Sequence, residues 1–224
     1  MRTLVLQLSD AWSWLRDLAA GLSVRRDSAP LDSVDRVDIF VATRSALITQ
    51  KKLYGYLQER MGLNYPKMFA DEQYAVSIRI ASMHVFAAAL ADMTVHAVAQ
   101  IGAGGRLHAG EHRGMAIACY RNGIAANAGH LTDAHDPDAW CAAFEERLAN
   151  TLWDNIAAGS SAFIESPLAL VRWAPIADEY KRLDRDIVEN SIRFAWNEVQ
   201  ADFRTRLDAD RLAADWKTRA ASNT

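Results

Sequence analysis

The long apolar segment 75–101, AVSIRIASMHVFAAALADMTVHAVAQI, places the strongest constraint on the fold. It contains no proline or glycine, and it is far longer than the strands of globular proteins, so it predicts an α-helix. Because it is apolar on nearly all sides, we expect it at the centre of a helical bundle. It carries His84, Asp92 and His96 and therefore lacks the charge-free span of about 20 residues that crossing a bilayer requires. We expect no transmembrane segment.

Helix start and stop signals divide the rest of the chain into further predicted helices. Seven of the eleven glycines fall within 102–138, which predicts a less regular middle segment. No run alternates long enough for a sheet, so we predict an all-α, single-domain bundle of about five to seven helices. The expected helices span 4–22, 33–61, 71–102, 109–126, 137–157 and 175–207, with a further start at Ser166–Pro167 and an extension or short final turn at 209–217.

The chain is expected to divide into an arm and one domain. Half of its 224 residues are hydrophobic, which is enough to supply one sizeable core. The polar stretch 25–30 ends in proline and separates an amphipathic N-terminal helix or arm, residues 1–26, from a helical bundle domain, residues 33–217.

Two apolar stripes run along the predicted helix 175–207, so we expect it to contact two neighbours. The first stripe contains Ile176, Tyr180, Leu183, Ile187 and Phe194, and the second contains Val188, Ile192, Val199, Phe203 and Leu207.

The central helix also carries the best candidate for chemistry. His84, Asp92 and His96 recur at multiples of four residues, which keeps them on one slowly drifting face. Asp92 is close enough in sequence to hydrogen-bond His96 and raise its basicity, as in general-base or metal chemistry. The alternative is that these polar groups satisfy one another, or neighbouring helices, inside the bundle.

A second histidine pair, His108 and His112, has the i, i+4 spacing of zinc ligands. It differs from the HExxH motif because Glu111 directly precedes the second histidine. Glycines on both sides favour a mobile polar surface loop over a metal site.

Several function classes are disfavoured by what the sequence lacks. There is no GxSxG or GxxxxGK[ST] motif, and no histidine has a glutamate three residues before it, which argues against a ferritin-like oxidase. The sequence specifies no cofactor. A net charge of −3 argues against nucleic acid as a partner, and two cysteines are too few for a disulfide framework, which favours a cytoplasmic location.

The N-terminal helix carries the clearest binding signal. Leu8, Trp12, Trp14 and Leu15 lie among flanking arginines, a composition that suits a partner's groove or a membrane surface. We therefore predict an adaptor or assembly factor that binds another protein, or itself as a homo-oligomer, through this helix or the C-terminal helix face. One alternative is a small helical enzyme, for example a hydrolase, or a ligand- or metal-binding bundle that uses His84, Asp92 and His96. The other is a peripheral membrane protein attached through residues 1–26.

Overall fold

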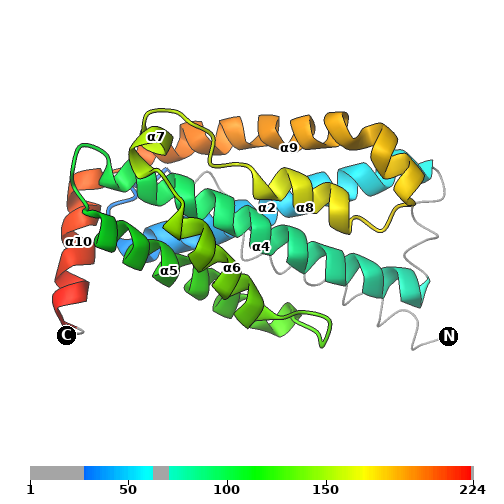
Figure 1. Ribbon diagram of the computed structural model, residues 1–224, viewed down its shortest axis with the longest axis horizontal. Coiled ribbons are helices and arrows are strands. Elements are labelled where there is room, and N and C mark those ends of the chain that lie inside the picture. Colours follow the sequence, from blue (N-terminus) through cyan, green and yellow to red (C-terminus); the bar gives the residue numbers. More distant parts are fainter. Residues whose placement is uncertain (1–27, 63–70, 223–224) are drawn as a thin grey trace.

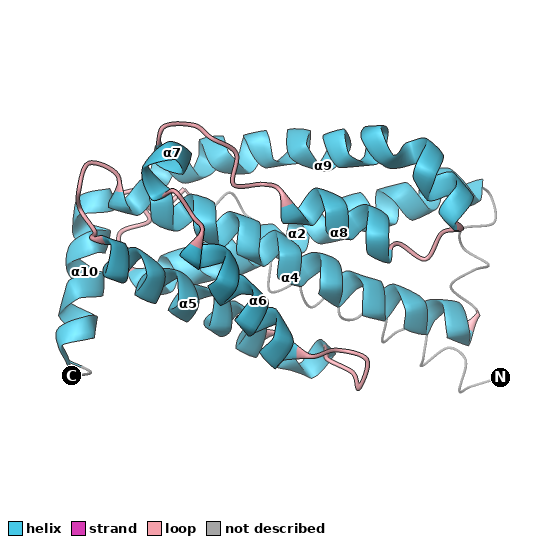
Figure 2. Ribbon diagram, in the orientation of Figure 1, coloured by secondary structure: helices cyan, strands magenta, loops and turns pink. Residues whose placement is uncertain are grey.

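The computed structural model describes residues 28–62 and 71–222, and within them the chain is an all-α bundle, as predicted. These residues form eight α-helices, one more than the upper predicted number, together with one 3₁₀ turn and a single isolated β-bridge (Figures 1 and 2). The predicted arm 1–26 and its proposed contact residues lie outside the described residues. The helices are α2 (Val34–Met61), α4 (Glu72–Gly102), α5 (Ala109–Ala126), α6 (Pro137–Ala149), α7 (Trp153–Ala157), α8 (Glu165–Trp173), α9 (Asp178–Arg206) and α10 (Ala209–Ser222), and the 3₁₀ turn is η2 (Ala128–His130).

Helix α4 forms the centre of the bundle (Figure 1). It packs against α2, α5, α6, α7, α8 and α10. Most of its apolar residues are consequently buried, including Val85, Leu90, Met93 and Val98. Among the described helices, α4 is the one that is long and apolar enough to cross a membrane by composition, and 56% of that apolar window is buried inside the bundle. Packing against six neighbouring helices accounts for its apolar composition.

The segment at the start of α2 is hydrogen-bonded to residues 206–208 and to α10. The Leu31 N–H donates to the Arg206 carbonyl oxygen at 2.8 Å, and the Asp208 N–H donates to the Leu31 carbonyl oxygen at 3.1 Å. Ser33 occupies the N-cap position, but its side chain makes no capping bond. Instead, Asp215 of α10 accepts the Val34 N–H at 2.8 Å. Helix α10, which crosses one end of the bundle in Figure 1, therefore caps α2 from outside.

The glycine-rich middle segment contains α5, which has the bounds predicted for the helix 109–126. Gly104 and Gly105 have φ values of 73° and 78° and turn the chain between α4 and α5, a conformation that glycine adopts readily. Gly102 allows a close approach, since a Cβ there would lie 2.0 Å from Nε2 of His112 on α5. Glycine is therefore required at residue 102 for α5 to pack this closely on α4.

The single helix predicted for 137–157 is wrong, because the chain breaks between α6 and α7. The Asn150 amide donates to the Glu146 carbonyl oxygen, and the Thr151 hydroxyl donates to the Arg147 carbonyl oxygen at 2.9 Å. These side chains take over carbonyl groups at the end of α6 and compete with continued helix. Leu152, at the break, is 67% exposed.

Candidate functional site

Asp92 caps a helix of the bundle. Its side chain is fully buried, and its Oδ1 accepts a hydrogen bond from Arg147 Nη1 at 2.9 Å. The same carboxylate accepts the first three N–H groups of the α8 region, from Ile164, Glu165 and Ser166, at 3.3, 3.2 and 2.8 Å. The N-cap residue of α8, Ile164, makes no capping hydrogen bond with its side chain. Asp92 supplies that cap from the neighbouring helix.

Both oxygens of Asp92 are thereby occupied by α8 and Arg147. Burial raises the pKa of the Asp92 carboxyl, and Arg147 with the α8 N–H groups opposes this effect. The predicted hydrogen bond to His96 is replaced by these contacts. The geometry gives Asp92 the role of holding α8 against α4.

His96 takes no part in the contact between Asp92, Arg147 and α8. It is 4% exposed and packs against the rings of Phe163 and Phe203, with centroids 5.4 and 6.0 Å away. Burial lowers its pKa to about 4, so the ring is neutral near pH 7. It lines a cavity of about 400 Å³ between α4, α9 and the loop that precedes α8.

His84 lines another cavity, of about 340 Å³, with Trp140 and Trp173 among its walls. Its ring stacks on Trp173 with centroids 3.5 Å apart, and it meets the edge of Trp140 at 5.1 Å. Burial also lowers the pKa of His84 to about 4.

The three candidate catalytic residues therefore do not converge on one site. The two cavities share none of their lining residues, and Asp92 lines neither. His96 follows His84 by twelve positions, which at about 1.5 Å of rise per residue separates them by roughly 18 Å along α4. Their joint catalytic role stays a prediction.

The predicted zinc pair lies at the start of α5 rather than in the expected surface loop. His108 is the N-cap residue of α5, and its N–H donates to Glu111 at 2.8 Å. His112 is buried, with its ring 5.0 Å from Trp153 and its Nδ1 3.0 Å from the His108 carbonyl oxygen. Within 28–62 and 71–222, no group of three or more histidine, cysteine or acidic side chains is placed to hold a metal ion.

Helix α9 contacts two neighbours, α2 and α8, as expected, but most of its first apolar stripe is exposed among the described residues. Its members Leu183, Ile187 and Phe194 are 75%, 74% and 73% exposed, and Tyr180 is 45% exposed. We call these four residues the α9 stripe. The second stripe faces the core as predicted, with Val188, Ile192, Val199 and Phe203 buried.

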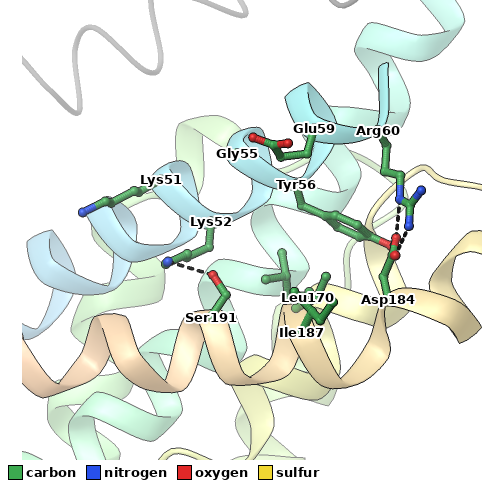
Figure 3. Close-up of a pocket in the computed structure, with 11 residues that line it drawn as sticks. Lys51, Lys52, Gly55, Tyr56, Glu59, Arg60, Leu170, Asp184, Ile187 and Ser191 are labelled. Carbon is green, nitrogen blue, oxygen red and sulfur yellow. Dashed lines mark hydrogen bonds and ion pairs between the residues drawn. The ribbon is translucent and has the colours of Figure 1, made fainter. Parts of the chain in front are cut away.

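A groove of about 580 Å³ runs beside the α9 stripe, between α2 and α9 (Figure 3). Ile187 belongs to both the stripe and the groove wall. Across the groove, Lys52 Nζ donates to Ser191 Oγ at 2.8 Å. Farther along, Tyr56 donates to Asp184 at 2.9 Å, and Arg60 forms an ion pair with the same carboxylate. Leu170 of α8 also lines this α2–α9 groove.

Charge and open space distinguish the α2 wall of the groove. Lys51 is exposed on this wall, and Lys52 is partly buried, with its pKa lowered by burial and by Lys51. Glu59 is the exposed acid of the same wall. At Gly55, nothing lies within 4 Å of the position that a Cβ would take. The groove is therefore weakly basic at one end and open at its centre.

Sequence reasoning missed Arg147 and the exposure of the α9 stripe. Ser166–Pro167 correctly marks the start of α8 to within a residue. A cap that comes from another helix leaves no local pattern, however, and apolar periodicity alone cannot show which of two stripes is covered.

Comparison of the chain with protein-family models, with curated proteins and with solved structures gives no match, so its function is argued from this geometry alone.

Proposed function

We propose that this chain is a helical protein-interaction protein, an adaptor or assembly factor, that binds an amphipathic helix of a protein partner. The docking face is the α9 stripe together with the α2–α9 groove. The observation that carries the proposal is the exposure of Leu183, Ile187 and Phe194, each about three-quarters open to solvent. Single exposed apolar residues are common on protein surfaces, whereas a row on one helix face is typical of a binding surface.

The spacing of the stripe favours a helical occupant. Tyr180, Leu183, Ile187 and Phe194 follow at steps of three, four and seven residues, which is the spacing of a seam between two packed helices. Full burial of a leucine, isoleucine or phenylalanine side chain contributes roughly 1.5 to 3 kcal/mol. Three such residues can offset a substantial part of the cost of association.

The charges beside the stripe indicate the chemistry of the partner. Lys51 and Lys52 outnumber Glu59 along the α2 wall, because Arg60 is already neutralised by Asp184. A partner helix with acidic residues on the flank that faces α2 complements this wall. One of its apolar side chains can enter the open space beside Gly55.

The proposal is tested by the native size of the full chain in extracts of its source cell. A double variant, Ile187→Asp and Phe194→Asp, removes the apolar face without touching the core. Gly55→Leu fills the groove while leaving α9 intact, and leucine is also the better helix former. The matched control is Ile39→Asp with Leu152→Asp, at residues that are 64% and 67% exposed elsewhere. Circular dichroism confirms that each variant is folded.

We expect the unaltered chain and the control to elute in a complex larger than 24.9 kDa, and both face variants to elute at the size of the free chain. A complex that survives in both face variants would contradict the proposal, as would the absence of any complex. If the purified chain alone forms a dimer that the face variants abolish, the occupant is a second copy, and the assignment to a separate partner is wrong.

A further inference from the structure

The cavity beside His96 is lined by many polar side chains. It lies between α4, the loop 157–163 and α9, and its volume of about 400 Å³ falls within the range of small-molecule sites. None of its lining residues is an aspartate or glutamate. The polar side chains that line it are His96, Gln100, Ser160, Ser161, Asn197, Gln200 and Arg204.

His96 lines this cavity and carries an unpaired ring nitrogen. Its Nε2 is buried and has no hydrogen-bond partner among the described residues. Buried polar groups in folded proteins are nearly always hydrogen-bonded, so an orphaned ring nitrogen at a cavity is an unusual feature that a bound group would explain. Because burial keeps the ring neutral near pH 7, it can present one N–H donor.

Arg204 supplies the positive charge of the cavity. The neighbouring arginines of α9 are paired differently, since Arg206 lies 3.7 Å from Asp202 and Arg193 lies 2.8 Å from Glu189. Within the described part of the chain, Arg204 has no ion pair or side-chain hydrogen bond. A guanidinium in a polar cavity without acids favours an anionic ligand with several oxygen acceptors.

We propose that this cavity binds a small polar anion, a carboxylate or a phosphate, which accepts hydrogen bonds from His96 Nε2 and from the Arg204 guanidinium. The amide and hydroxyl groups of Gln100, Asn197 and Ser160 surround the remaining space. This site lies on α4, α9 and the loop 157–163, apart from the α2–α9 groove, so it is independent of the docking face.

The test is a titration of the full chain with inorganic phosphate and, separately, with acetate, at an ionic strength held constant with sodium chloride. Nitrogen–proton NMR spectra of the imidazoles report on His96 directly, and the His96→Phe variant assigns its signal. Arg204→Gln removes the proposed charge at an exposed position. Arg182→Gln, at an exposed arginine near the other end of α9, is the matched control.

We expect the His96 signal to shift with one or both anions and to reach saturation. Arg204→Gln should weaken this binding by about tenfold or more, and Arg182→Gln should leave it unchanged. Tighter binding of phosphate would identify a phosphorylated ligand, and tighter binding of acetate a carboxylate. A His96 signal that does not saturate with either anion would overturn the proposal. Equal weakening by both arginine variants would overturn it as well, because it would indicate non-specific attraction.

Discussion

Replacement of Asp92 by asparagine should destabilise the fold strongly. The asparagine keeps the size of the side chain but removes the negative charge that pairs with Arg147, a side chain only 11% exposed. It also turns one acceptor oxygen into an amide donor that faces the N–H groups at the start of α8. Loss of one partner from a buried ion pair typically costs about 3 to 5 kcal/mol. We expect a loss of this size in the free energy of unfolding, measured by urea denaturation followed by circular dichroism.

The control and a double variant separate this role from a general effect of charge. Glu198→Gln on the exposed side of α9 should change stability by less than about 0.5 kcal/mol. Combining Asp92→Asn with Arg147→Met should cost less than the sum of the two single changes by about 1 kcal/mol or more, because the partners are coupled. If Asp92→Asn alone lowers the free energy of unfolding by less than about 1 kcal/mol, the capping role is refuted and Asp92 becomes a candidate for catalysis.

The free energy of unfolding should fall by about 2 kcal/mol between pH 7 and pH 5 because of His96, since this residue takes up a proton near pH 6.5 in the unfolded chain and only near pH 4 in the folded chain. In the His96→Phe variant, the free energy of unfolding measured with urea should change less steeply with pH. Gly102→Ala should cost about 1 to 3 kcal/mol in urea denaturation, because the added Cβ collides with the His112 ring. The full chain should not float with anionic liposomes if its partner is a protein; flotation that is lost on replacing Trp12 and Trp14 with serine would establish the membrane alternative.

Two controls sharpen these measurements. Gly110→Ala lies in the first turn of α5 with nothing within 4 Å, so it should be neutral or slightly stabilising, and a loss equal to that of Gly102→Ala would contradict the steric argument. An unchanged pH slope in His96→Phe would show that the acid sensitivity comes from another group, of which His84 is the first candidate.

The fold was readable from the sequence because most of its determinants are local. Periodicity and end signals located α2, α4 and α5 to within one or two residues, since caps and glycines act at the positions where they stand. The break after α6 was missed because Asn150 and Thr151 act by capturing carbonyl oxygens, a competition that apolar periodicity does not reveal.

The candidate site was less predictable because its contacts join distant parts of the chain. His84, Asp92 and His96 share a face of α4, but each contacts a different residue of the segment 163–173, which forms α8 and the end of the loop before it. Asp92 contacts residues more than fifty positions away, among them Arg147 and Ser166. The spacing of residues along one helix determines which face of the helix their side chains occupy. The partner of each side chain depends on how other helices pack against that face.

The most direct test of the docking face is a photo-cross-link from its centre. The photoreactive residue benzoylphenylalanine replaces Phe194 in the full chain, or Ile39 as the control, and the cells are irradiated before mass spectrometry maps the linked peptide. The docking proposal predicts a link from residue 194, and not from residue 39, to an amphipathic helix with acidic residues on one flank in another protein. It also predicts that Gly55→Leu reduces this link. The absence of a link from residue 194, or a link to this same chain, would contradict it.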